Sequence, residues 1–294
     1  MVLRSIIAPV DGSPDSWRGV QTALSLGART SSRVRVLHVE FGTVDRALVL
    51  DRLGREVARF DTAGVETDLE VRIGVDSVHD EIEAVVRTHP GALVVMASHG
   101  RGRSTALVGS VAEEVQRRTI GPILLVGPRV RSTDFDGPIV VTVDGSETSE
   151  RAVPLGVSWA IDLGLDVVIV HSTGTPSSPS PATSRPSTES EACDTARSTY
   201  IADLARRIRH LHARPIECQE IHGRHPATAV ADHAERSGAA MIVASSHGRT
   251  GFDRLTMGSV VSGFVRHAPC PVLVIRDLHE RPVVPPHPLT AHVL

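Results

Sequence analysis

Short apolar runs alternate along the N-terminal half of the chain with longer amphipathic stretches. The runs are rich in β-branched residues and nearly continuous, which is typical of parallel strands covered on both faces. They predict strands at residues 5–10, 33–40, 67–73, 92–97 and 123–127. The stretch 76–89 instead predicts a helix, whose apolar face holds Val78, Ile82, Val85 and Val86. Strands and helices that alternate in this way predict a doubly wound α/β sheet.

The sequence also contains an internal repeat. IIAPVDGS at 6–13 recurs as IVVTVDGS at 139–146, VVMASHGR at 94–101 as IVASSHGR at 242–249, and GPILLV at 121–126 as CPVLVI at 270–275. Matches in the same order along 294 residues indicate two homologous domains. We assign domain 1 to residues 1–128, a linker to 129–136, domain 2 to 137–276 and a tail, expected to be disordered, to 277–294.

Most of the length difference between the repeats lies in a segment rich in Ser, Thr and Pro at residues 172–191. It contains almost no large apolar residue, so it cannot contribute to a packed core. We expect a mobile loop there. It follows the second strand of domain 2 on the ligand side of the sheet, where it could act as a lid.

Composition excludes several classes of protein. The net charge of −3 offers no broad attraction to nucleic acid or anionic lipid. No apolar run approaches the roughly 20 residues of a membrane helix, and the three cysteines lack C-x-x-C spacing. We therefore expect a cytoplasmic protein that binds neither nucleic acid nor membrane. All 31 basic residues are arginine, which excludes a Walker loop, a kinase-type ATP lysine and a Schiff-base lysine.

An aspartate ends the first predicted strand of each domain, Asp11 in one and Asp144 in the other, and Gly and Ser follow it. One interpretation is a turn in which Asp or Ser caps the next helix and Gly allows the tight bend. The other is a ligand site, because an acid at the switch point of a doubly wound sheet can accept hydrogen bonds from sugar hydroxyls or an adenine amino group. Both interpretations stay open at this point.

A glycine-containing loop follows the fourth predicted strand of each domain. Nine residues separate Gly248 from the Gly258–Ser259 pair, and eight separate Gly100 from Gly109–Ser110. Glycines let the backbone approach an anion, and the helix that begins at the Gly-Ser pair favours phosphate at its N-terminus. A capping box of Ser110 and Glu113 would explain that serine without a ligand. It would not explain the upstream glycines, so we favour phosphate binding, supported by Arg101 or Arg249.

Serine and histidine stand side by side in the same loops, as Ser98–His99 and Ser246–His247. A nucleophile and a base would need to contact one another. Adjacent side chains rarely do so, and no G-x-S-x-G elbow surrounds these pairs. We therefore assign no catalytic residue, and the scattered histidines suggest no metal ligand set.

Taken together, these features resemble the universal stress protein family, in a tandem two-domain form, over about residues 3–127 and 137–276. In the nucleotide-binding branch of that family the loop reads G-x2-G-x9-G-S/T, an Asp ends the first strand and a small residue ends the second. The fold expected is α/β, with two tandem doubly wound domains. Each is a five-stranded parallel sheet in the order 3-2-1-4-5 with helices on both faces, and the last strands of the two domains pack side by side about a pseudo-twofold axis.

The resemblance also implies which residues contact the nucleotide. Two departures concern the first loop glycine, which is Ala97 in domain 1 and Ser245 in domain 2, and the loop of domain 1 is one residue short. We expect both domains to bind, with domain 2 handling the triphosphate better. The implied contacts are Asp11, Val39, Gly100, Arg101, Gly109, Ser110 and Val111 in domain 1, and Asp144, Ser245, Gly248, Arg249, Gly251, Gly258, Ser259 and Val260 in domain 2.

The leading hypothesis is an ATP-binding regulatory protein of the stress response, more a binding module than an enzyme. Mg²⁺ could accompany the nucleotide, a homodimer is expected from the resemblance, and the protein partners are unknown. Two alternatives stay open. One is a slow ATPase or adenylate-forming enzyme, and the other is a ligand-free dimeric scaffold that associates through its last strands.

Overall fold

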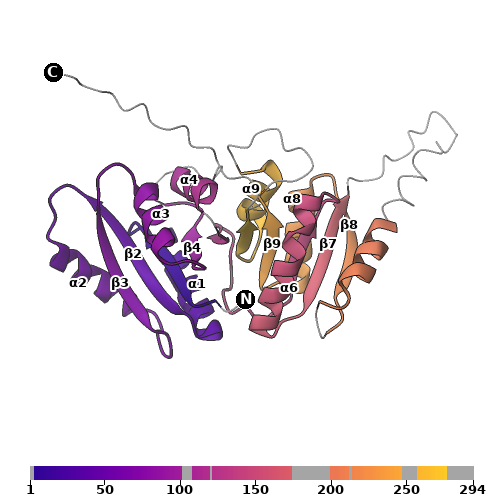
Figure 1. Ribbon diagram of the computed structural model, residues 1–294, viewed down its shortest axis with the longest axis horizontal. Helices are drawn as coiled ribbons and strands as arrows, with labels where there is room; N and C mark the ends of the chain where they lie inside the picture. Colours follow the sequence, from indigo (N-terminus) through magenta and orange to yellow (C-terminus); the bar gives the residue numbers. More distant parts are fainter. Residues whose placement is uncertain are drawn as a thin grey trace, which may run out of the picture.

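The computed structural model places the two domains side by side, with domain 1 in indigo to magenta and domain 2 in pink to yellow (Figure 1). The structure describes residues 3–100, 108–119, 121–173, 199–211, 214–246 and 257–276. The expected mobile loop from residue 174 to 191 and the tail at 277–294 lie outside these ranges. Within them, no helix is both long enough and apolar enough to cross a membrane.

Domain 1 alternates strands and helices as the apolar pattern predicts, and the predicted strand bounds agree within about one residue. Its helix α3 begins two residues later than the predicted stretch because Ser77 caps it, accepting a hydrogen bond from the Asp80 N–H. The elements are β1 (Ser5–Val10), α1 (Pro14–Thr30), β2 (Arg33–Phe41), α2 (Arg46–Val57), β3 (Thr67–Gly74), α3 (Val78–Thr88), β4 (Leu93–Ala97), α4 (Ser110–Arg118) and β5 (Ile123–Val126).

Domain 2 repeats this order, except that two shorter helices follow its first strand where domain 1 has the single helix α1. Its elements are β6 (Ile139–Val143), α5 (Glu147–Glu150), α6 (Ala152–Leu163), β7 (Val167–Thr173), β8 (Glu217–His222), α8 (Pro226–Ser237), β9 (Met241–Ser245), α9 (Ser259–His267) and β10 (Val272–Ile275), with a further helix described over residues 199–208. Strand β7 therefore includes the first two residues of the Ser-, Thr- and Pro-rich segment.

All ten strands form one sheet, in the order β3-β2-β1-β4-β5-β10-β9-β6-β7-β8. Each half has the expected order 3-2-1-4-5, and every pairing within a half is parallel. The halves join where β5 pairs antiparallel with β10, with Leu124 opposite Leu273. The expected packing of the last strands is thus confirmed. The antiparallel pair relates the two domains by a pseudo-twofold axis.

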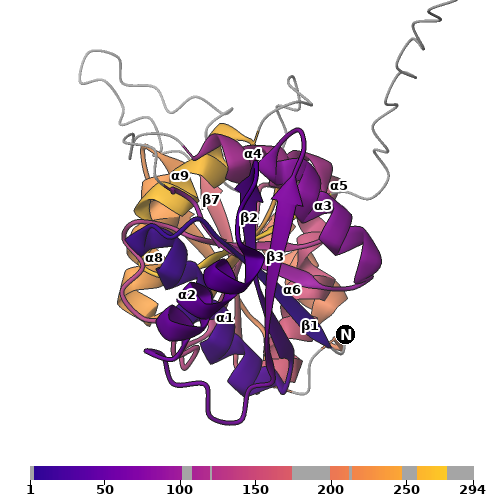
Figure 2. The same ribbon diagram turned by 90° about the vertical axis from the view of Figure 1, so that its left-hand side faces the viewer.

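Helices cover both faces of the sheet because strand residues alternate between two apolar clusters. Ile6 belongs to a cluster that includes residues of α1, α2 and α6 on one face, whereas its neighbour Ile7 belongs to a cluster that includes residues of α3, α4, α8 and α9 on the other. Figure 2 views the β2–β3 end of the molecule and shows α1 and α2 on one side of the domain 1 strands and α3 on the other. The carboxyl ends of β1 and β4 therefore open between helix layers.

The linker and the domain boundary are tightly packed. Phe135 is buried in the linker, and the Arg131 N–H donates to the Pro269 carbonyl at 2.9 Å. At the end of β5, Gly127 lies against the Val265 carbonyl of α9, where a side-chain carbon would collide with that oxygen. These contacts bind domain 1 directly to the last helix and strand of domain 2.

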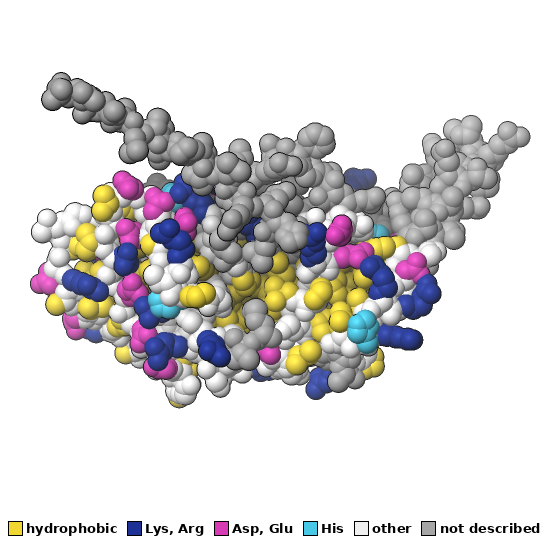
Figure 3. Space-filling view, in the orientation of Figure 1, with side chains coloured by type: hydrophobic (Ala, Val, Ile, Leu, Met, Phe, Trp, Pro, Cys, Tyr) yellow, Lys and Arg dark blue, Asp and Glu magenta, His cyan; other side chains and the backbone are white. Residues whose placement is uncertain are grey.

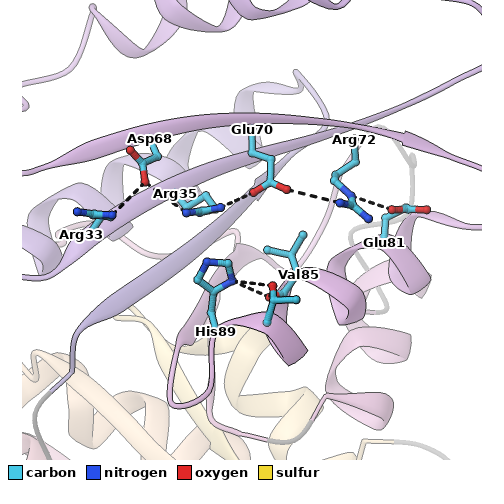
Figure 4. Close-up of polar contacts among 9 residues, drawn as sticks. Arg33, Arg35, Asp68, Glu70, Arg72, Glu81, Val85 and His89 are labelled. Carbon is cyan, nitrogen blue, oxygen red and sulfur yellow. Dashed lines mark hydrogen bonds and ion pairs between the residues drawn. The ribbon is translucent and has the colours of Figure 1, made fainter.

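The outer strands β2 and β3 carry a ladder of ion pairs (Figure 4). Arg35 bridges Asp68 at 3.4 Å and Glu70 at 2.6 Å, and the Arg72 Nε donates to Glu81 of α3 at 3.0 Å. Charged side chains of this kind protect an edge strand such as β3 from pairing with another chain. On the face shown in Figure 3, basic and acidic side chains are interspersed, so this face presents no extended basic surface.

Candidate functional site

A cavity of about 680 Å³ opens at the carboxyl ends of β1 and β4 in domain 1. This is where the strand order reverses, since β1 pairs with β2 on one side and with β4 on the other. Its walls are largely aliphatic and include Leu37, Ile82 and Met96, which the sequence analysis did not predict as ligand contacts. Of the predicted contacts, it brings together Asp11, Val39, Gly100, Gly109, Ser110 and Val111.

Asp11 is fixed at the wall of this cavity by its own turn. The Ser13 N–H donates to Asp11 Oδ1 at 2.9 Å, and Ser13 caps α1 by accepting a hydrogen bond from the Ser16 N–H at 3.2 Å. The turn interpretation is therefore confirmed. Asp11 Oδ2 faces Gly100, where an added Cβ would collide with it. The turn and a ligand site do not exclude one another, because the turn orients the carboxylate toward the cavity.

Helix α4 begins at the same cavity without a side-chain cap. The capping-box alternative for Ser110 and Glu113 does not apply, because Gly109 is the N-cap residue and Ser110 is the first residue of the helix. The first intrahelical bond runs from the Glu113 N–H to the Gly109 carbonyl at 3.0 Å. The N–H groups of Ser110, Val111 and Ala112 therefore have no acceptor within the helix.

The helix starts of this protein differ in their caps, and α6 and α8 also lack a side-chain cap. Helices α1, α2, α3 and α5 each begin with a Ser or Asp side chain that accepts hydrogen bonds from first-turn N–H groups. Helix α9, the counterpart of α4 in domain 2, again has a glycine at its N-cap, Gly258, and no side-chain cap. In both domains the uncapped start faces the cavity and presents donors and the positive end of the helix dipole to it.

Domain 2 repeats this geometry around a cavity of about 220 Å³. The Ser146 N–H donates to Asp144 Oδ1 at 2.9 Å, and the Ser262 N–H bonds the Gly258 carbonyl at 2.9 Å. Arg101, Gly248, Arg249 and Gly251 lie outside the described residues. The predicted contacts that this cavity brings together are Asp144, Ser245, Gly258, Ser259 and Val260.

Sequence reasoning missed Ser172, which also lines the second cavity. It was missed because Ser172 begins the low-complexity segment, which drew attention as a loop. The repeat contained the signal, since LHV at 37–39 aligns with VHS at 170–172 and places Ser172 at the position of Val39. The smaller, polar serine changes one wall of the second cavity from apolar to hydrogen-bonding.

Ser98 and His99 also line the first cavity, and they contact one another. The expectation that these adjacent side chains would point apart is wrong, because Ser98 Oγ lies 2.8 Å from His99 Nδ1. The chain leaves β4 at Ala97, so the alternation of side chains along a strand no longer applies. His99 Nε2 is buried without a hydrogen-bond partner among the described residues, so the third member of a catalytic triad is not in place there.

A buried histidine on β2 contacts the backbone at the end of β1. His38 Nδ1 lies 2.7 Å from the carbonyl of Val10, the residue before Asp11, and Nε2 lies 3.0 Å from Glu40 Oε1. Arg52 contacts the same carboxylate oxygen at 3.1 Å. The hydrogen bond with His38, and then the Arg52 guanidinium, lower the pKa of Glu40. His38 thereby ties the strand that carries Asp11 to its neighbour β2.

The family model for the universal stress protein family matches residues 3–127 and 137–276, one match in each domain. The chain belongs to the universal stress protein family. Universal stress protein Rv1996 of Mycobacterium tuberculosis is 27% identical over 197 residues, which cover 66% of this chain and 61% of that protein. A universal stress protein of Mycolicibacterium smegmatis is 30% identical over 208 residues, 66% of each chain.

Solved structures share the tandem fold of this universal stress protein. Protein PA1789 from Pseudomonas aeruginosa superposes with a TM-score of 0.65 at 15% identity, covering 94% of this chain and 93% of that one. A universal stress protein from Archaeoglobus fulgidus gives a TM-score of 0.61 at 18% identity, covering 93% and 96%. At these identities the likeness concerns the fold.

Proposed function

We propose that this universal stress protein binds an adenine nucleotide, with ATP as the reference ligand, and acts as a regulatory protein rather than as an efficient enzyme. The observation that carries the proposal is the uncapped start of α4, which lines the same cavity as a carboxylate fixed by its own turn. A helix start of this kind attracts phosphate, and a strand-end acid accepts hydrogen bonds from a nucleoside.

Different residues of the cavity would contact different parts of the nucleotide. The N–H groups of Ser110, Val111 and Ala112 would donate to phosphate oxygens, and the helix dipole would replace the lysine that this chain lacks. Asp11 would accept hydrogen bonds from ribose hydroxyls or the adenine amino group. The aliphatic walls would contact the purine ring, as apolar walls do in most small-molecule sites.

The Mg²⁺ expected with the nucleotide has weaker support. Within the described ranges, no group of three or more His, Cys, Asp or Glu side chains is arranged to hold a metal ion. Asp11 supplies a single carboxylate at the cavity, and a nucleotide-bound Mg²⁺ keeps several waters and needs only one or two protein ligands. The binding proposal therefore rests on the backbone donors and not on a metal.

The slow ATPase alternative has one specific observation in its favour, the contact between Ser98 and His99 at the cavity wall. If this pair activated a hydroxyl or a water, phosphate release from ATP would fall strongly in a His99→Ala variant. Turnover that is unaffected by this substitution would remove the role of the pair, and no turnover at all would restrict the protein to binding.

Titration calorimetry of the full chain with ATP tests the binding proposal. We expect saturable heat from the natural chain and a loss of about 10- to 100-fold in affinity in Asp11→Asn, the size expected for a hydrogen bond to a charged group. Asparagine can still form the turn to Ser13, so the fold should persist. The matched control is Asp51→Asn, which changes an exposed acid of α2 paired with Arg55. Absence of heat from the natural chain would contradict the proposal.

A further inference from the structure

The two cavities differ threefold in size although they share one design. The domain 1 cavity measures about 680 Å³ and the domain 2 cavity about 220 Å³. Sites for ligands the size of a nucleotide usually span about 300–1,000 Å³. The first cavity falls within this range and the second falls below it. Each cavity is lined by its own Gly-Ser pair at the helix start.

The helices beside the second cavity pack closely against one another. Helix α9 carries Gly263 against Ala227 of α8, and a Cβ placed on Gly263 would lie only 2.5 Å from the Ala227 Cβ. The two helices therefore meet at a glycine–alanine contact, which brings their backbones close together. Figure 1 shows α8 and α9 side by side over the domain 2 strands. Any larger residue at position 263 would force them apart.

In domain 1 the corresponding helices are joined by long charged side chains instead. Counted from the Gly-Ser pairs, Glu114 of α4 occupies the position of Gly263. Glu114 Oε2 accepts a hydrogen bond from Arg118 Nε at 3.0 Å, and Arg118 also reaches Asp80 of α3 at 2.8 Å. The ion pair between Arg118 and Asp80 therefore links α4 to α3.

Two side chains of α9 also occupy space at the second cavity. Val261 and Phe264 line the second cavity, where the equivalent positions of α4 hold the smaller Ala112 and Val115. Phe264 is buried among the apolar residues under α8 and α9. Its ring occupies volume beneath the helix start. The N-terminal N–H groups of α9 remain uncapped there, beside the smaller cavity of about 220 Å³.

We infer that each chain binds one adenine nucleotide, in domain 1, and that domain 2 retains the loop and helix start but is closed by Phe264 and the Gly263–Ala227 contact. This inference rests on the proposed function. It ranks the domains in the opposite order to the loop spacing, which favoured domain 2. Loop spacing describes the phosphate end of the site, whereas helix packing decides whether the rest of the ligand fits.

The test is the number of ATP molecules bound per full chain, measured by calorimetry at protein concentrations well above the dissociation constant. We expect one in the natural chain and none with comparable affinity in Asp11→Asn. Phe264→Val, which introduces the domain 1 residue, should raise the number to two. Gly263→Ala should also raise the number to two, by separating α9 from α8. Alanine favours the helical conformation, so this substitution should not disrupt α9. We call these two substitutions the opening variants. Phe60→Val is the matched control, since Phe60 stacks on Trp17 away from both cavities, and should still bind one.

The possible outcomes distinguish the single-site inference from the proposed nucleotide binding on which it rests. Two molecules bound by the natural chain, or one that persists at full affinity in Asp11→Asn, would overturn the single-site inference and leave nucleotide binding standing. One molecule in both opening variants, with their folding verified by thermal unfolding, would overturn the assigned cause of closure. No binding by the natural chain would overturn the proposed function and the inference together.

Discussion

Gly100 lies directly against the carboxylate of Asp11, so that a side-chain carbon on Gly100 would collide with Asp11 Oδ2. The two residues follow β4 and β1, which are neighbours in the sheet although the residues are far apart in sequence. Glycine is required here for close approach and not for an unusual backbone angle. The contact places the loop after β4 and the strand-end acid on the same wall of the cavity.

Replacement of Gly100 by alanine should displace the Asp11 carboxylate. We expect Gly100→Ala to weaken ATP binding by at least about tenfold, the cost of one hydrogen bond to a charged group, with little change in thermal stability because Gly100 is exposed. A double-mutant cycle by calorimetry checks the cause. If displacement of Asp11 explains the loss, Gly100→Ala should cost nothing further in the Asp11→Asn background.

A single backbone donor at the start of α4 can be removed without loss of the helix. Gly109 has φ −63° and ψ 146°, a conformation that a following proline accepts, and proline is favoured at the first helical position. Ser110→Pro should therefore fold normally but bind ATP about 10- to 100-fold more weakly. The matched control is Arg46→Pro, at the first position of α2. Equal affinities in the two variants would contradict the role of the α4 amides.

The pKa of Glu40 predicts an acid-dependent loss of stability. It is lowered from 4.5, first by the hydrogen bond with His38, so the folded state favours the charged carboxylate. The stabilisation is complete above about pH 4.5 and is lost as the pH falls through the lower pKa of the folded state. Glu40→Gln should thus be less stable than the natural chain in urea at pH 7, and the difference should shrink below pH 4.5. A difference independent of pH would argue against this linkage.

The close approach of Gly127 to α9 makes the domain boundary sensitive to a single methyl group. Gly127→Ala would place a carbon against the Val265 carbonyl, and we expect a loss of about 1–3 kcal/mol in the free energy of unfolding, as for other overpacked sites. Gly54→Ala in helix α2 is the control, because its nearest contact is Leu69 Cδ1 at 3.6 Å. It should be neutral or stabilising. Chemical denaturation of both variants provides the comparison.

Local patterns in the sequence predicted much of this protein. Branched apolar runs located the strands, because a strand buried on both faces needs apolar residues at successive positions. The repeat predicted two domains of one design. Asp11, Gly100 and the Gly109–Ser110 pair were predicted as site residues, since each stands at the end of an element whose type could be recognised from a few neighbouring positions. The structure places all of them around one cavity.

Relations between distant segments could not be obtained in this way. The contact of His38 with Val10 and Glu40, and the meeting of Gly263 with Ala227, depend on how strands and helices pack together. The choice between a capping box and a glycine N-cap at the start of α4 also needed the structure, because Ser and Glu at capping-box spacing are compatible with a helix whose N-cap is Gly109.

The sequence by itself thus determined the order of strands and helices, the two domains and the residues at the strand ends, because these follow from short-range periodicity and turn chemistry. Only the tertiary structure decided that ten strands form one sheet and that the two cavities differ in volume. The physical reason is that cavity volume is set by side chains from separate elements. Gly263 of α9 lies against Ala227 of α8 in one domain, whereas Arg118 of α4 reaches Asp80 of α3 in the other.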